Sequence, residues 1–141
     1  MSELFLLARI AGRRVAIAAQ QVESVVDIGE VTPVPLAKSH VRGLTALRSR
    51  VVTVVDAPVA LGLAEPDRGP ASRAVITLVD GHYYALLVED VEDVALFECA
   101  PLASGIALNH GWARVARGVV EPDQEPVLAI DAAALVLPAA A

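Results

Sequence analysis

Residues 41–56 read VRGLTALRSRVVTVVD, and the rest of the chain can be laid out around them. The stretch predicts two strands joined by a basic tight turn near Arg48. Its second strand, from Val51 to Val55, is β-branched at every position, which favours a pleated sheet over a helix. Because apolar and polar residues do not alternate in this run, we expect it to be buried on both faces of a sheet.

The chain contains the same unit twice. Gly43 and Asp56 recur 75 positions later (118 − 43) as Gly118 and Asp131, with an apolar strand between them in both copies. Such internal repeats determine the architecture of a fold and are therefore sought first.

An earlier segment repeats as well. Gly12 matches Gly81 at an offset of 69 positions (81 − 12), and the match runs without a gap to Val25 and Val94. The larger later offset indicates a net insertion of six residues (75 − 69) in the second half. Two copies of about 70 residues favour a duplicated small domain over a solenoid of short units. We predict one domain with lobes at 1–66 and 72–137, a linker within 64–72, and the possibility of strands exchanged at the boundary.

Glycines and aspartates predict the turns and helix starts of each copy. Asp-Gly at 80–81 is a strong hairpin signal because both residues must accept a positive φ. Asp56 and Asp131 each precede a helix signal and are predicted N-cap residues. The glycines predicted at structural turns are Gly12, Gly43, Gly81 and Gly118.

Three valines follow the first hairpin. Val22, Val25 and Val26 have a spacing that permits one or two helical turns with all three on one side, while their β-branched character also permits a strand. A strand is predicted for 112–120, where the chain enters the second Arg-Gly element.

The composition bounds the class of protein. The chain has 141 residues, of which 55% are hydrophobic and 20% charged, so disorder is excluded as its overall state. A net charge of −6 argues against a general nucleic-acid binder. Cys99 is the single cysteine, which favours the cytosol. The apolar run at residues 4–8 is too short for a signal peptide or a membrane span, and neither is expected.

The sequence presents no catalytic constellation. Asp56 and Asp131 could be considered as an acid–base pair, but N-capping explains both without catalysis. The three histidines are scattered without metal-ligand spacing, and the phosphate-binding glycine motifs are missing, so neither a metal nor a cofactor is predicted. The acidic cluster at 89–93 is interpreted as a solvated face. The inventory favours a binding module.

At residues 41–57 the sequence resembles the CheW-like family of bacterial chemotaxis coupling proteins, whose pattern is roughly [IV]-[RK]-G-[VI]-x-N-L-R-G-x-[VI]-[VI]-P-[VI]-[VI]-D-L. The resemblance covers about residues 4–137. It departs from the family pattern at four positions, which are Ser24, Ala46, Ser49 and Thr53. It implies an all-β fold of two SH3-like five-stranded barrels, formed by the duplication and carrying short helices.

The resemblance also implies a function and partners. Family members are cytoplasmic, non-enzymatic adaptors that are recruited to membrane receptor arrays. They bind the regulatory domain of the chemotaxis histidine kinase and, in a groove between the barrels, the cytoplasmic tip of methyl-accepting receptors. The alternatives are a stand-alone regulatory subunit of another two-component kinase and a small enzyme with an unrecognised site.

Four residues are candidates for binding the receptor or the kinase. Val22, Val25 and Val26 are the candidate wall of an apolar groove that receives a helix face, and burial in the core is the alternative. Arg48 either contacts a partner or holds the turn by donating to backbone carbonyls, and the second role is the one we favour.

Overall fold

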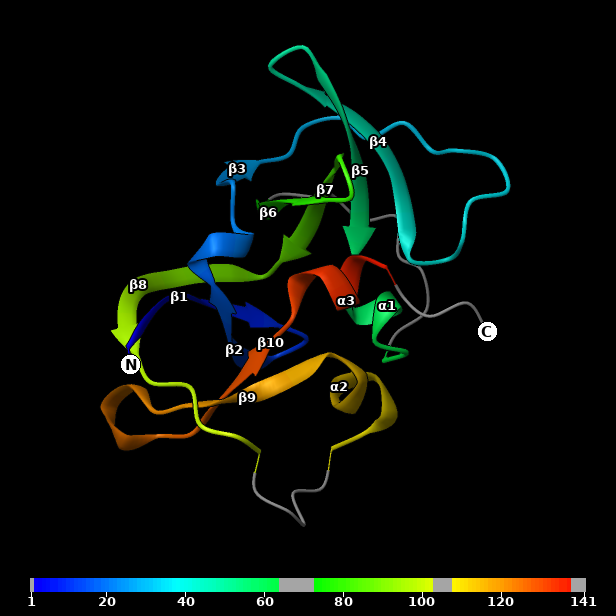
Figure 1. Ribbon diagram of the computed structural model, residues 1–141. Helices are drawn as coiled ribbons and strands as arrows, with labels where there is room; N and C mark the ends of the chain where they lie inside the picture. The colour runs from blue at the N-terminus through cyan, green and yellow to red at the C-terminus, as the bar shows by residue number, and fades with distance from the viewer. Residues whose placement is uncertain (1, 64–72, 103–107, 138–141) are drawn as a thin grey trace.

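The computed structural model describes residues 2–63, 73–102 and 108–137, and within them the chain forms two five-stranded sheets with a few short helices (Figure 1). The strand order is β8-β1-β2-β10-β9 in sheet A and β3-β6-β7-β5-β4 in sheet B. The strands of sheet A are β1 (Glu3–Ile10), β2 (Arg13–Ala18), β8 (Asp90–Phe97), β9 (Ala116–Val120) and β10 (Val127–Ile130). The strands of sheet B are β3 (Ser24–Asp27), β4 (Val41–Leu47), β5 (Arg50–Asp56), β6 (Arg73–Val79) and β7 (His82–Val88).

Each sheet takes strands from both halves of the sequence. Sheet A combines the first hairpin with β8, β9 and β10, and sheet B combines the second hairpin with β3, β4 and β5. Four pairings join strands from different halves: β2 with β10 and β5 with β7 are parallel, and β1 with β8 and β3 with β6 are antiparallel. The remaining pairings, within each half, are antiparallel. The two sheets have the same plan, so the repeat in the sequence is a repeat in the fold. The lobes 1–66 and 72–137 mark the copies in the sequence, whereas the sheets mix them; the predicted linker at 64–72 lies largely outside the described residues.

Both faces of each sheet are apolar. One face of sheet A packs inward around Phe5, and the inner face of sheet B packs around Val54. The other faces of the two sheets meet in a shared core that includes Leu6 and Leu86. Two buried faces explain why the strands do not alternate. The expectation of two-sided burial fails at Val51, which is 67% exposed because it lies beside the hairpin end.

Three two-residue turns connect the antiparallel hairpins. Residues 11–12, 48–49 and 80–81 all have positive φ at both positions, which is the geometry of type I′ turns. Gly12 (φ 76°) and Gly81 (φ 80°) therefore lie at equivalent turns.

Gly43 and Gly118 lie within strands β4 and β9 rather than at turns. A Cβ on Gly43 would lie 2.2 Å from the Thr32 carbonyl oxygen, and one on Gly118 would lie 2.5 Å from the Ala100 carbonyl oxygen. At both positions a segment that has left one edge strand approaches the other edge of the same sheet. The repeated glycine thus makes room for a close backbone approach.

Three short helices lie where the sheets meet (Figure 1). They are α1 (Ala57–Ala60), α2 (His110–Val115) and α3 (Ala132–Val136), and two 3₁₀ turns, η1 (Ala19–Gln21) and η2 (Pro122–Gln124), complete the described elements. The strand predicted for 112–120 is wrong in its first part, because Asn109 caps α2 by accepting a hydrogen bond from the Trp112 N–H at 2.9 Å. Only 116–120 is a strand.

The two edges of each sheet are not joined into a closed barrel by the described strands. Isolated bridges approach this closure: Thr32 exchanges two backbone hydrogen bonds with Leu44 beyond β3, and Ala100 exchanges two with Val119 beyond β8.

Candidate partner-binding site

The segment 19–27 carries the chain from sheet A to sheet B. After β2, η1 makes one tight turn that ends where the Val22 N–H donates to the Ala19 carbonyl at 3.0 Å. The Glu23 N–H then donates to the Ile76 carbonyl at 2.7 Å, which begins the pairing of β3 with β6. The valines in this segment favour the extended chain over continuation of the helical turn.

The three candidate valines point to three different environments. Val22 is partly buried against the core shared by the sheets, and Val26 is partly buried against the inner core of sheet B. Val25 is 39% exposed. Of the two conformations that the sequence permits, the strand is found, and the three valines do not share one side because neighbouring side chains in a strand alternate between faces. Val25 is therefore the member of the three that a partner can reach.

Val25 lies at the margin of the shared core. Its cross-strand partner on β6 is Val75, which is fully buried in that core. The repeat-equivalent residue in sheet A is Val94, which is 49% exposed and is paired with buried Leu6. In both sheets, then, the apolar face between the sheets extends to the surface through one valine on an edge strand.

Gln21 ties this segment to helix α3. Its Nε2 donates to Asp131 Oδ1 at 2.8 Å, and its Oε1 accepts from the Ala132 N–H at 3.0 Å. Asp131 Oδ1 also accepts from the Ala133 N–H at 3.0 Å, so Asp131 is the N-cap residue of α3. Only one orientation of the amide satisfies both partners.

Asp56 holds the equivalent position before α1. Its Oδ1 accepts from the Val59 N–H at 3.3 Å, and its Oδ2 lies 3.4 Å from Arg42 Nη2. The two aspartates are each engaged at a helix start, which is the N-capping role that the sequence predicts for them.

Arg48 lies at the tip of the β4–β5 hairpin. Its side chain is exposed, and among the described residues its guanidinium takes part in no hydrogen bond. The positive φ values of Arg48 (49°) and Ser49 (68°) form the turn without help from this side chain. The favoured role as a donor to turn carbonyls is thus not seen. The neighbouring Arg50 lies over the ring of Tyr83, with 4.4 Å between its Cζ and the ring centroid.

The structure does not bring Arg48 and Val25 onto one strand pair. Arg48 belongs to the hairpin of the edge strand β4, and Val25 belongs to β3, the opposite edge in the order of sheet B. The candidate site therefore has two separate parts, the crossover segment and the hairpin tip.

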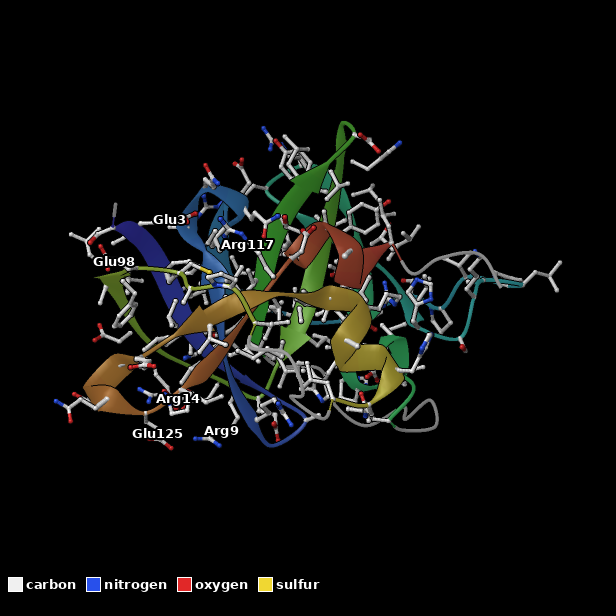
Figure 2. The ribbon with its side chains drawn as sticks, turned by 60° about the horizontal axis from the view of Figure 1, so that its bottom comes forward. Glu3, Arg9, Arg14, Glu98, Arg117 and Glu125 are labelled. Atoms are coloured by element: carbon white, nitrogen blue, oxygen red, sulfur yellow. The ribbon has the colours of Figure 1, made fainter. Side chains whose placement is uncertain are left out.

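Sheet A carries charged pairs at both ends of β1. Figure 2 shows Glu3 with Arg117 at one end and Arg9 with Arg14 at the other. Arg117 Nη2 lies 3.0 Å from Glu3 Oε1, and Glu92 is shared by Arg14 at 2.6 Å and Arg9 at 3.4 Å. Glu92, which the sequence places on a solvated acidic face, is thus paired.

A buried histidine and an arginine lie beside the helices. His40 is only 8% exposed, and burial, followed by the charges of Lys38 and Arg114, lowers its pKa from the ordinary value of 6.5, against a hydrogen bond with the Val136 backbone. Arg114 donates to the carbonyls of Ala134 and Ala60, and so joins α3 to α1. Sequence reasoning missed both roles, since neither residue belongs to a periodic pattern.

Comparison with known proteins now identifies the family. The family model described as a CheW-like domain matches residues 4–138. The chain belongs to the CheW-like family. A solved structure, the scaffolding protein TtCheW from Thermoanaerobacter tengcongensis, superposes with a TM-score of 0.73 at 20% sequence identity, covering 92% of this chain and 89% of that one. This likeness shows that the chain has the CheW-like fold. No curated protein matches the chain.

Two further features are missing from the described ranges. No cluster of three or more His, Cys, Asp or Glu side chains there could hold a metal ion. None of the helices in the same part of the chain has the length and apolar character that crossing a membrane requires.

Proposed function

We propose that this chain is a non-enzymatic chemotaxis adaptor that couples methyl-accepting receptors to the chemotaxis histidine kinase. Membership of the CheW-like family supports this proposal, and the solved relative is itself named a scaffolding protein. The partners are the cytoplasmic tip of the receptors and the regulatory domain of the kinase. Recruitment to receptor arrays at the cytoplasmic side of the membrane follows from binding both.

We also infer that each sheet forms the wall of an SH3-like barrel. The support comes from the paired bridges Thr32–Leu44 and Ala100–Val119, which lead the chain from one edge of each sheet toward the other. Gly43 and Gly118 supply the space that this approach needs.

The observation that carries the proposed receptor contact is the exposure of Val25 at the margin of the shared core. A receptor tip that is a helical hairpin presents apolar side chains along a helix face, and a partly exposed valine beside an apolar seam suits such a face. Val22 and Val26 hold the segment in place, because Val22 packs against the shared core and Val26 packs against the inner core of sheet B. Arg48, at the hairpin tip, is the proposed polar contact to a partner.

Val25→Glu tests the receptor contact. The strand position is partly exposed, so the variant stays folded, whereas a carboxylate buried against an apolar helix face weakens receptor binding by at least about tenfold. Val26→Glu is the control that packs against the inner core of sheet B, and it is expected to melt far below the wild type. Val94→Glu is the matched exposed control on sheet A, and it keeps the receptor. Melting temperature and binding to a receptor tip fragment and to the kinase regulatory domain are measured together.

The binding results for Val25→Glu test the receptor contact separately from the adaptor function. A folded Val25→Glu protein that loses the receptor and keeps the kinase supports the contact, and one that keeps both partners rejects this surface. The adaptor function is tested separately by affinity capture of the wild-type chain from native cells. Retention of another sensor kinase without chemotaxis receptors, or turnover in a substrate screen, would favour a kinase regulatory subunit or an enzyme instead.

A further inference from the structure

The crossover between the sheets is anchored on both sides of Val22. Before it, Gln21 is bonded through both ends of its amide to the start of α3, with distances of 2.8 and 3.0 Å. After it, the Glu23 N–H is bonded to Ile76 on β6. Helix α3 is itself fixed, because Ala132, Leu135 and Val136 are buried. The direction in which the chain enters β3 therefore depends on where Gln21 holds it.

The second copy of the fold is linked differently. There the chain passes from β7 to β8 through the single residue Glu89, whose carboxylate accepts the N–H of Gly12 at the β1–β2 turn. Helix α1, the equivalent of α3, begins at Asp56, and the side chain bonded to that cap comes from Arg42 of its own copy. An aspartate alone is sufficient to cap a helix. The cap of α3 thus does not require Gln21, and the additional bonds of Gln21 occur on the crossover that carries Val25.

We propose that Gln21 is a positioning residue for the receptor-facing strand, in that it sets the orientation of Val22 to Val25 by binding the start of α3. This inference rests on the proposed receptor contact at Val25. Gln21 itself is turned toward α3 and acts through the segment that follows it. A glutamine suits the position because it donates to the Asp131 carboxylate and accepts from the Ala132 N–H with one planar group.

Breaking the hydrogen bond between Gln21 and Asp131 tests this role in the whole chain. In Gln21→Glu the new carboxylate can still accept from Ala132, but it repels Asp131, so the link is broken. Asp131→Asn alone is the matched control, because asparagine caps helices about as well as aspartate and can accept from Gln21.

Two measurements are made on each protein. Hydrogen exchange of the Glu23 amide in the free chain reports the order of the crossover, and the dissociation constant for a receptor tip fragment reports its function, with the kinase regulatory domain as reference. Gln21→Glu is expected to speed exchange and weaken receptor binding about tenfold each, the size expected for losing a hydrogen bond to a charged group. Kinase binding stays within about twofold of the wild type, and Asp131→Asn alone stays within about twofold in both measurements.

The outcomes are distinguishable from failure of the receptor contact itself. Unchanged exchange and unchanged receptor binding in Gln21→Glu overturn the proposal, and so does faster exchange with normal receptor binding, since Gln21 then orders the crossover without positioning a contact. Loss of kinase binding in parallel with the receptor also overturns it, because a general loss of structure then explains both. If Val25→Glu keeps the receptor, the proposed surface fails independently of the exchange result.

Discussion

The same cross-strand pair is apolar in sheet A and charged in sheet B, at equivalent ends of the β1–β8 and β3–β6 pairings. In sheet A, Leu4 lies opposite Leu96, and both are substantially exposed. In sheet B the equivalent positions, each displaced by 69 residues, are Arg73 and Asp27, which form an ion pair at 3.5 Å. The backbone pairing accepts either pair because these side chains end in solvent. Surface chemistry has therefore diverged between the copies while the strand arrangement has not.

The positions that determine the backbone conformation carry the same residue in both copies. Gly43 and Gly118 both make room for a carbonyl, and Asp56 and Asp131 both begin a helix. The copies thus agree where a change would disturb the main chain and differ where it would alter only what the surface presents. This difference separates residues that maintain the fold from residues that are free to select partners, and it gives each kind a different expected response to substitution.

The largest effect is expected at the repeated glycines. In Gly43→Ala and Gly118→Ala the new methyl group would lie 2.2 and 2.5 Å from carbonyl oxygens that are held in backbone bridges. We expect each change to cost about 3 kcal/mol or more of unfolding free energy, measured by denaturant titration.

Gly29→Ala is the matched control, because no atom lies within 4 Å of its added Cβ. It should change the stability by less than about 0.5 kcal/mol. Near-normal stability of Gly43→Ala or Gly118→Ala would show that the neighbouring carbonyl can move away from the added methyl group. The two glycines would then not have equivalent roles in the two copies.

Local sequence signals account for much of the fold. Glycine at the second turn position and β-branched runs specify hairpins through contacts that are close in sequence, so the β1–β2 and β6–β7 hairpins were predictable. The exchange of strands could be named only as a possibility, because a repeat shows which residues are equivalent but not whether a strand pairs within its own copy. For α2, Asn109 was an available N-cap signal that the apolar run after it obscured.

The candidate site was harder to predict than the fold. The three valines fit a helical or an extended segment, and only the pairing with β6 decides which of them is exposed. The role of Gln21 depends on a partner 110 positions away, and a single glutamine in a polar stretch carries no signal of such a contact. The hairpin pattern identifies Arg48 as a candidate, and its place at the tip leaves it within reach of a partner.

A smaller, pH-dependent effect is expected at His40. The repeat-equivalent residue is Val115, and the carbonyls of both accept the same bond, from the N–H of Asp56 and of Asp131 respectively. Because burial lowers the pKa of His40 below 6.5, the unfolded chain binds a proton at this position more readily than the folded chain. The free energy of unfolding therefore has its full value above pH 6.5, where His40 is neutral in both states. It decreases as the pH falls from 6.5 toward the folded-state pKa, because the unfolded chain takes up the proton first.

His40→Val tests this sign by installing the residue of the other copy. We expect the melting temperature of the wild type to fall more between about pH 7 and pH 5 than that of the variant, since the other two histidines remain in both proteins. The comparison uses the slope with pH, so any constant cost of the smaller side chain cancels. Equal slopes would mean that His40 titrates alike in the folded and unfolded chains.

The smallest effect is expected where the copies already differ. Leu4→Arg with Leu96→Asp would give sheet A the ion pair of sheet B. Sheet B shows that this strand pairing accepts such a pair, and its Arg73 and Asp27 side chains are 44% and 80% exposed, so the pair itself contributes little. We expect the unfolding free energy to change by less than about 1 kcal/mol, since exposed cross-strand pairs differ by no more than this. Leu6→Arg, on the same face of β1 but 3% exposed, is the control that should unfold the chain. A comparable loss in the double variant would place Leu4 and Leu96 in the core, and the divergence between the two sheet ends would then be a difference in packing rather than in the surface offered to partners.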